Sequence, residues 1–254
     1  MIRWIPLVLG LRLSICWAVV GAGALSAARA ESIVFPADAG VVDVTQPPYN
    51  ARGDGKTDCS AAIQQALQDH PDQNCVIYLP NGTYLVSTPL LWPFGTQLGQ
   101  GAQRATILQG QSRSGAVLKL ADYAPGYGSL GSPRAVLWLG DERSSPERNS
   151  VRNLTINTGA GNNGAIGILL NVAEQGCVRE VTIVAGGTGS GAAGIDASAV
   201  PRIGPCLIKN VRIEGFDTGL RAGFTVNSLT LENCEFINQK STAIRNRGQV
   251  LSIR

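Results

Sequence analysis

The feature that most constrains this chain is a repeat that begins near residue 150. Four segments share the order apolar, any, polar, apolar, any, apolar, and the intervals between them are 27, 30 and 23 residues. They begin at Val151, Val178, Ile208 and Leu231. A second pattern, a small residue before an apolar one, follows each segment, at Gly167-Ile168, Gly194-Ile195, Gly219-Leu220 and Ala243-Ile244. Two interleaved patterns with one irregular period predict a solenoid, with one coil per repeat.

The spacing within the first pattern predicts the shape of each coil. Apolar residues lie three and then two positions apart, as in Val151, Leu154 and Ile156. A separation of two keeps side chains on one face of a strand, and the extra residue predicts a bend. Asparagine, which tolerates the left-handed backbone of such a bend, stands there in three of the four segments, and Glu180 interrupts the series.

This pattern favours an all-β chain folded as a parallel β-helix. A leucine-rich repeat would need a more regular period and its own Leu/Asn consensus, and propeller blades need roughly 40 or more residues.

Upstream, a glycine-rich turn at 53–58 leads into a short amphipathic helix, capped by Asp58 or Thr57 and ending near His70. Five short apolar segments read as strands, at 75–80, 83–87, 105–108, 116–120 and 135–139.

Residues 1–30 resemble a secretory signal peptide. Arg3 and Arg12 precede an apolar run at 13–27, and Ala28-Arg29-Ala30 supplies small residues at the cleavage positions. The alternative, a membrane anchor, would need an uninterrupted run of roughly 20 apolar residues. We therefore expect an exported protein, extracellular or periplasmic, with a domain at 31–254 and no membrane association once the signal is removed.

Charge and cysteines narrow the function further. The chain has 21 basic and 18 acidic residues; three of the basic ones lie in the leader, which leaves 18 of each sign. This balance argues against a nucleic-acid binder.

Five cysteines remain after the leader, without metal-type spacing. Cys59 and Cys75 bracket the helix, and we predict a disulfide there worth about 3 kcal/mol, the alternative being two buried thiols.

The opening of the domain is similar to a known superfamily. Gly53-Asp-Gly-Lys-Thr-Asp58, Ala61-Ala-Ile-Gln64 and Val76-Ile-Tyr-Leu-Pro-Asn-Gly-Thr-Tyr84 resemble the N-terminal signature of the pectate-lyase superfamily. The likeness is to its branch of rhamnogalacturonase-like and exo-β-1,3-glucanase-like proteins, over about residues 40–254. The resemblance implies a right-handed parallel β-helix whose short N-terminal helix caps one end, and a polysaccharide as substrate or ligand.

The resemblance brings no catalytic set with it. Polygalacturonases of the superfamily carry Asn-Thr-Asp, Asp-Asp, Gly-His-Gly and Arg-Ile-Lys motifs. Here Asp217-Thr218-Gly219 and Arg202-Ile203-Gly204 match only in part, and His70 has no flanking glycines. A calcium ion is expected only if the protein is a lyase, which would need clustered carboxylates and a basic residue. No other cofactor and no metal ligands are predicted.

Two outward-facing rows are the candidate sites. If Val151, Leu154 and Ile156 point inward, then Arg152, Arg179 and Lys209 form an outward row on successive coils, with Glu232 on the next. Coils lie about 4.8 Å apart, so like charges in such a row repel one another. An acidic polysaccharide such as polygalacturonate would neutralise this repulsion by binding along the row. The alternative is that each base pairs with a nearby carboxylate, such as Glu180 or Glu214.

The second row follows the Gly-Ile pattern. It contains Asp196, Arg221 and Arg245 as catalytic candidates, and Arg247 two residues further on as a substrate-binding residue. Asp196 is a candidate acid/base group, and the arginines suit bidentate binding of a uronate carboxylate. The alternative is an exposed ladder of salt bridges, which contributes little to stability.

Two functions from different classes fit these features. The first is a secreted polysaccharide lyase or glycoside hydrolase acting on a pectin-like or β-glucan polymer. The second is a non-catalytic carbohydrate-binding or cell-surface structural module. Because residues 250–254 look like the middle of a further strand, we expect the domain to be C-terminally incomplete, with catalytic residues beyond Arg254.

Overall fold

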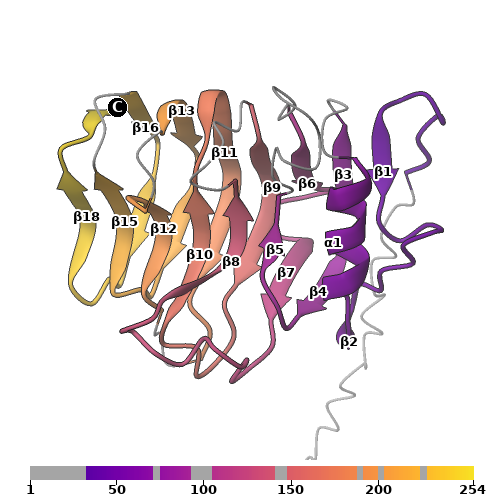
Figure 1. The fold of residues 1–254 in the computed structure, drawn as a ribbon, viewed down its shortest axis with the longest axis horizontal. Coiled ribbons are helices and arrows are strands. Elements are labelled where there is room, and N and C mark those ends of the chain that lie inside the picture. Colours follow the sequence, from indigo (N-terminus) through magenta and orange to yellow (C-terminus); the bar gives the residue numbers. More distant parts are fainter. Residues whose placement is uncertain are drawn as a thin grey trace, which may run out of the picture. The chain divides into compact units, whose positions relative to one another are not determined.

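The computed structural model describes residues 33–70, 75–92, 105–140, 148–187, 191–199, 203–223 and 228–254. The predicted signal peptide and Arg202 lie outside these ranges. Within them, strands from distant parts of the sequence stack in parallel along one axis, and helix α1 (Ser60–Asp69) lies near the N-terminal end (Figure 1). None of the described helices is long and apolar enough to cross a membrane.

The described strands form two parallel sheets. The larger one, sheet A, has 13 strands and the smaller one, sheet B, has six. Sheet A contains β1 (Val41–Asp43), β2 (Asp54–Asp58), β3 (Val76–Leu79), β4 (Gly82–Val86), β6 (Ile107–Gly110), β7 (Ala116–Leu120), β9 (Ser150–Asn157), β11 (Ala173–Val184), β13 (Gly204–Lys209), β14 (Arg212–Glu214), β16 (Ser228–Glu232), β17 (Glu235–Ile237) and β19 (Val250–Ile253). Sheet B contains β5 (Leu90–Leu91), β8 (Arg134–Leu139), β10 (Ala165–Leu170), β12 (Ala193–Ala197), β15 (Thr218–Gly223) and β18 (Thr242–Arg247).

The predicted coil register is confirmed. Ile183 pairs with Ile156 on one side and with Ile213 on the other, and Ile213 pairs in turn with Phe236. On sheet B, Ile195 pairs with Ile168 and Leu220 in the same way. Ile156, Ile183 and Ile213 are at most 1 % exposed, so each coil contributes equivalent side chains to one buried column. The chain is therefore the parallel β-helix that the repeat predicts, with the helix at its N-terminal end.

Sheet A is folded into two faces at the predicted bend. The first half of β9 pairs with β6 and its second half with β7, and β11 divides its pairing in the same way between β13 and β14. The bend residues have left-handed φ angles of 50° to 55°. They are Asn153, Glu180, Asn210 and Asn233. Asparagine is common here because it adopts the left-handed conformation at a low energetic cost, and its side-chain amide can form hydrogen bonds to neighbouring coils.

Glu180 continues the ladder of bend residues instead of interrupting it. Asn233 Nδ2 donates to Asn210 Oδ1 at 2.8 Å, and Asn210 Nδ2 donates to the Glu180 carboxylate. Asn153 Nδ2 bonds the carbonyl oxygens of Gly110 and Gln111 on the preceding coil. A carboxylate oxygen therefore takes the place of an amide oxygen as the acceptor, which explains why glutamate is accepted at this position.

Replacing Glu180 tests this ladder. We expect Glu180→Ala to lower the free energy of unfolding by about 1 kcal/mol, because Asn210 loses its acceptor, whereas Glu180→Asn restores the asparagine series and leaves stability unchanged or higher. Thermal unfolding followed by circular dichroism measures both. Glu174→Ala is the control, since Glu174 also has a left-handed φ angle but its side chain is exposed. Equal melting temperatures for the Ala and Asn variants of Glu180 would contradict the ladder.

The predicted Cys59–Cys75 disulfide is wrong, because both residues are buried free thiols. Cys59 directly precedes α1, and its Sγ lies 3.2 Å from Arg52 O and 3.3 Å from Thr57 O. Cys75 Sγ lies 3.4 Å from the carbonyl oxygen of His70. Each sulfur is thus used as a small buried group that bonds backbone carbonyls, which is the alternative the sequence left open.

The predicted N-cap, Asp58 or Thr57, is wrong: Cys59 occupies that position without a capping side-chain bond, and Asp58 stabilises the helix start from one residue further out. Asp58 Oδ1 accepts bonds from Ser60 N at 2.9 Å and Ser60 Oγ at 2.5 Å, and Oδ2 accepts one from Ser87 Oγ at 2.5 Å. Burial alone would raise the pKa of Asp58, but these hydrogen bonds lower it below its usual value. The carboxylate therefore links the glycine-rich turn to the first residue of the helix and to the residue that follows β4.

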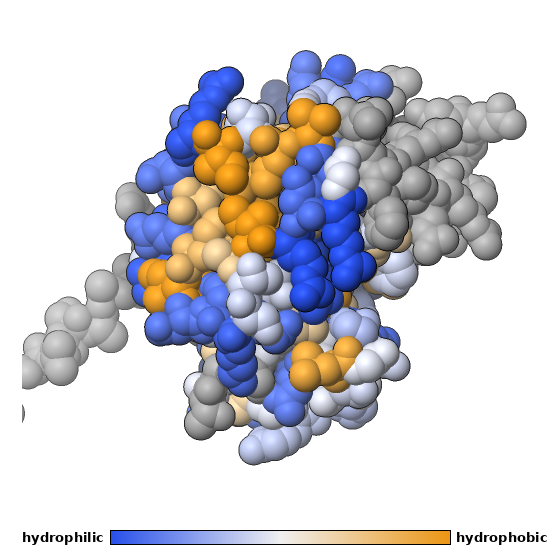
Figure 2. Space-filling view, turned by 90° about the vertical axis from the view of Figure 1, so that its left-hand side faces the viewer, coloured by the Kyte–Doolittle hydropathy of each residue, from blue (hydrophilic) through white to orange (hydrophobic). Residues whose placement is uncertain are grey.

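The last described coil presents apolar side chains at the opposite end. Val250 is 53 % and Ile253 63 % exposed, and Phe236, Ile244 and Leu251 are half-buried beside them. Figure 2 looks onto this end, where apolar surface crosses the coil between polar rims.

Candidate functional site

The candidate site is a groove on the outer face of sheet B, formed by strands β12, β15 and β18. It has a volume of about 290 Å³ and is lined by Asp196, Ser198, Arg221, Ala222, Arg245 and Arg247. Asp196 pairs in register with Arg221, and Arg221 with Arg245, so that three successive coils each contribute one residue. The register thus brings together the three residues predicted on this row, Asp196, Arg221 and Arg245, with the predicted Arg247 beside them.

Asp196 is held as an ion-pair partner. Its Oδ1 accepts bonds from Ser198 N at 2.9 Å and Ser198 Oγ at 2.7 Å, and its Oδ2 lies 3.4 Å from Arg221 Nη1. The side chain is 9 % exposed. Both oxygens are therefore engaged with donors on the same coil and on the next one, which suits a role in positioning Arg221.

Arg221 links two coils. In addition to Asp196, its Nη2 donates to Ala192 O at 2.8 Å, and its side chain is 21 % exposed. Its Nε is buried and has no hydrogen-bond partner among the described residues. An unsatisfied buried N–H costs free energy unless a water or ligand supplies an acceptor, and this one lies at the groove.

Arg245 and Arg247 are the cations that remain for a ligand. Both are exposed, and neither has a carboxylate within ion-pair distance among the described residues. Arg247 pairs in register with Gly223, whose missing side chain leaves room there: a Cβ on Gly223 would lie 3.2 Å from the Arg247 Cβ. Three guanidinium groups against one carboxylate give the groove a surplus of positive charge and of hydrogen-bond donors.

The row continues away from the groove as an apolar strip. Leu169 pairs with Asp196 on one side and with Trp138 on the other. Trp138 is half-buried, and its indole Nε1 has no partner in the described part of the chain. Along the axis the outward row therefore changes from a cationic section to an apolar and aromatic one.

The other predicted row also forms, but on sheet A. Arg179 pairs in register with both Arg152 and Lys209, and Lys209 pairs with Glu232. Lys209 Nζ lies 2.6 Å from Glu232 Oε1, and this hydrogen bond lowers the pKa of the glutamate below its usual value. Glu180 and Glu214, the alternative partners predicted for these bases, are engaged elsewhere: Glu180 binds Asn210, and Glu214 binds Arg212.

The two rows thus differ in the charge they offer. On sheet A, Lys209 is neutralised and Arg152 is half-buried, which leaves Arg179 as the exposed cation. On sheet B, Arg245 and Arg247 are both exposed. Among the described residues, no cluster of three or more His, Cys, Asp or Glu side chains is arranged to hold a metal ion.

Comparison with known proteins places the chain in a family. Residues 42–252 match the model of the family described as rhamnogalacturonase A/epimerase, pectate lyase-like. A glucan 1,3-beta-glucosidase of Cochliobolus carbonum is 32% identical over 96 residues, which are 34% of this chain and 12% of that protein. A non-secreted LysM effector, LysM15, of Penicillium expansum is 40% identical over 78 residues, 25% of this chain and 5% of that protein.

A solved structure agrees on the fold. ORF18 of Geobacillus virus E2 superposes with a TM-score of 0.55 at 16% sequence identity, covering 82% of this chain and 40% of that one. The chain spans less than half the length of each of these three proteins. The family match covers both sheets and the groove. This chain belongs to the rhamnogalacturonase A/epimerase, pectate lyase-like family.

Proposed function

We propose that the chain is a secreted, carbohydrate-active β-helix protein whose sheet B groove binds an acidic polysaccharide. The observation that carries this is the pair of exposed arginines, Arg245 and Arg247, beside the Arg221–Asp196 ion pair on adjacent coils. Guanidinium groups bind carboxylates through two parallel hydrogen bonds. A uronate polymer supplies one carboxylate per sugar, and its neighbouring sugars would reach Leu169 and Trp138.

The groove supports binding more directly than hydrolysis. Glycoside hydrolases generally need two carboxyl groups about 5 to 9.5 Å apart, and Asp196 is the one acidic residue that lines the groove in the described part of the chain. A second candidate function, polymer cleavage as a lyase or hydrolase, is favoured by the family match and by the glucosidase relative. Under that reading the groove would hold the polymer while other residues carry out the reaction.

A polymer panel tests the proposal. Purified protein is incubated with polygalacturonate and with laminarin, a neutral β-1,3-glucan, while binding, unsaturated-product absorbance and reducing ends are followed. We expect binding of polygalacturonate that weakens as salt rises from about 0.01 to 0.15 M, because the contacts are ionic. Product formation would add catalysis to binding. Equal binding of both polymers, or binding indifferent to salt, would contradict a cationic groove.

A further inference from the structure

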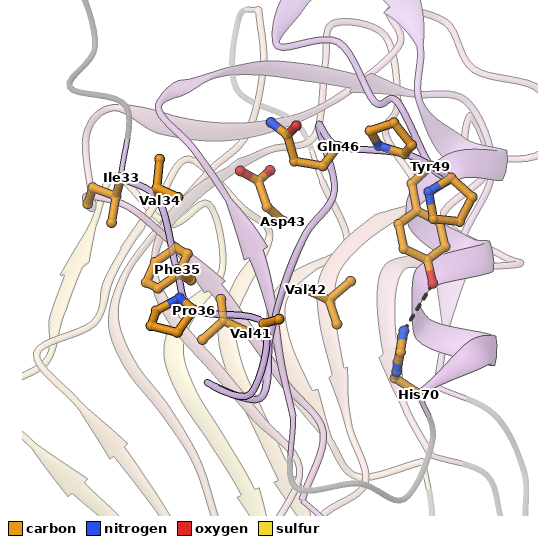
Figure 3. A pocket seen from close by; sticks show the side chains of 13 residues that line it. Ile33, Val34, Phe35, Pro36, Val41, Val42, Asp43, Gln46, Tyr49 and His70 are labelled. Carbon is orange, nitrogen blue, oxygen red and sulfur yellow. Dashed lines mark hydrogen bonds between the residues drawn. The ribbon is translucent and has the colours of Figure 1, made fainter.

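A second cavity lies at the N-terminal end of the β-helix, far along the axis from the sheet B groove. It has a volume of about 570 Å³ and lies between the extended segment 33–37 and the strand β1, with Tyr49 and His70 on the other side. Figure 3 shows Phe35 and Tyr49 on opposite sides of it, with Asp43 and Gln46 between them. Its walls expose polar and apolar surface in similar amounts, and its volume lies within the range of small-molecule sites.

The walls are fixed in place. Phe35 packs edge-on against Tyr78 with ring centroids 4.9 Å apart, which holds the 33–37 segment against sheet A. The Tyr49 hydroxyl donates to Asp69 Oδ2 at 3.1 Å and lies 3.0 Å from His70 Nε2. Burial and Asp69 raise the pKa of Tyr49 to about 12, so the phenol stays neutral at physiological pH. Its hydroxyl is engaged, and its ring is left as an apolar wall.

The polar groups between these walls offer mainly acceptors. Asp43 Oδ1 is bonded by Thr45 N at 2.8 Å and Thr45 Oγ1 at 2.7 Å, whereas Oδ2 has no partner among the described residues. Gln46 donates one N–H to Thr45 Oγ1 at 3.3 Å, and its Oε1 is likewise without a described partner. The described lining contains no Lys or Arg. A ligand here must supply hydrogen-bond donors, and a uronate carboxylate would be repelled by Asp43.

We propose that this cavity is a second carbohydrate site that binds a neutral sugar, with hydroxyl groups donating to Asp43 Oδ2 and Gln46 Oε1 and with the C–H face of the ring against Phe35 or Tyr49. Unlike the groove, this cavity disfavours anionic sugars, so the assignment goes beyond the function proposed for the groove. The two sites would then hold chemically different parts of a polymer, or two polymers.

His70 gives this proposal a direct test, because it is the single histidine of the chain and lines the cavity. Protein labelled with ¹³C-histidine and purified without a histidine tag should give one imidazole Cε1–Hε1 signal. We expect laminaribiose and cellobiose to shift this signal in a saturable manner below about 20 mM, and digalacturonate to leave it unchanged. No shift with either neutral disaccharide, or an equal shift with digalacturonate, would overturn the proposal.

Variants separate the cavity from the groove. Asp43→Asn keeps an acceptor for Thr45 and replaces Oδ2 by a donor, so we expect at least a tenfold weaker response of His70 to the neutral disaccharides. Asp38→Asn, an exposed acidic residue outside the lining, is the matched control and should respond as the parent does. Arg245→Ala should also leave the His70 response intact, so that failure of the groove and failure of the cavity are distinguished. An unchanged response in Asp43→Asn would contradict the assignment of the cavity.

Discussion

Replacing Gly194 by alanine is expected to destabilise the β-helix by about 2 kcal/mol, which corresponds to a melting temperature about 4 to 8 °C lower. A Cβ at this position would lie 2.2 Å from Ile213 Cγ2 and 2.9 Å from the carbonyl oxygen of Gly219. One of these atoms is backbone of the next coil, so the clash cannot be relieved by a rotamer change. The interior is too narrow there for any side chain.

The control for this experiment is Gly128→Ala. Gly128 has a φ outside the left-handed region and nothing within 4 Å of an added Cβ, so we expect its stability to change by less than about 0.5 kcal/mol. The fourth coil already carries Ala243 at the equivalent position, where the residue is exposed and its methyl group has room. A Gly194→Ala protein that melts within 1 °C of the Gly128→Ala protein would show that the coil spacing adjusts freely.

The largest functional effect is expected from the double variant Arg245→Ala with Arg247→Ala. Each charge-assisted hydrogen bond to a carboxylate contributes about 1.5 kcal/mol or more, so loss of both should weaken polygalacturonate binding about 100-fold. The folded structure should be unaffected, since both side chains are exposed and form no described ion pair. Titration calorimetry or affinity electrophoresis at one fixed salt concentration measures the change.

A variant of equal charge identifies which row binds the polymer. Arg179→Ala with Lys209→Ala also removes two positive charges, but on the outer face of sheet A. We expect it to reduce binding less than threefold, through the net charge alone. If the two double variants weaken binding equally, the polymer follows overall charge and not the groove. If the sheet A variant has the larger effect, the row of Arg152, Arg179 and Lys209 is the polymer site.

The fold was predictable because burial enforces the repeat. A shift of one residue in a strand would expose all of its inward-facing side chains. The spacing of Ile156, Ile183 and Ile213 in the sequence therefore predicts the register that the structure shows. The same logic placed Asp196, Arg221 and Arg245 together, since outward residues follow from inward ones. The role of Asp196 was not predictable in this way, because it depends on Ser198 and Arg221 side-chain geometry.

The loops carried the features that the sequence did not reveal. The N-terminal cavity is built from the irregular segment before the first glycine-rich turn, where no periodicity relates Phe35, Asp43 and Tyr49. The predicted disulfide failed for a similar reason: positions on either side of a helix do not determine which way Cys59 and Cys75 point. The Glu180 contact was missed because its acceptor role depends on a neighbouring coil.

The in-register stacking of coils has a consequence for how such a protein can change. Excising residues 178–207 would remove one full turn, from the start of one repeat to the start of the next. Every inward column would close up by a single step, while Arg152 came to adjoin Lys209 and Leu169 came to adjoin Arg221. Whole-turn loss or duplication would therefore change the order of surface residues along the axis, while each interior side chain still packs against an apolar side chain of the same kind, as Ile156 would against Ile213.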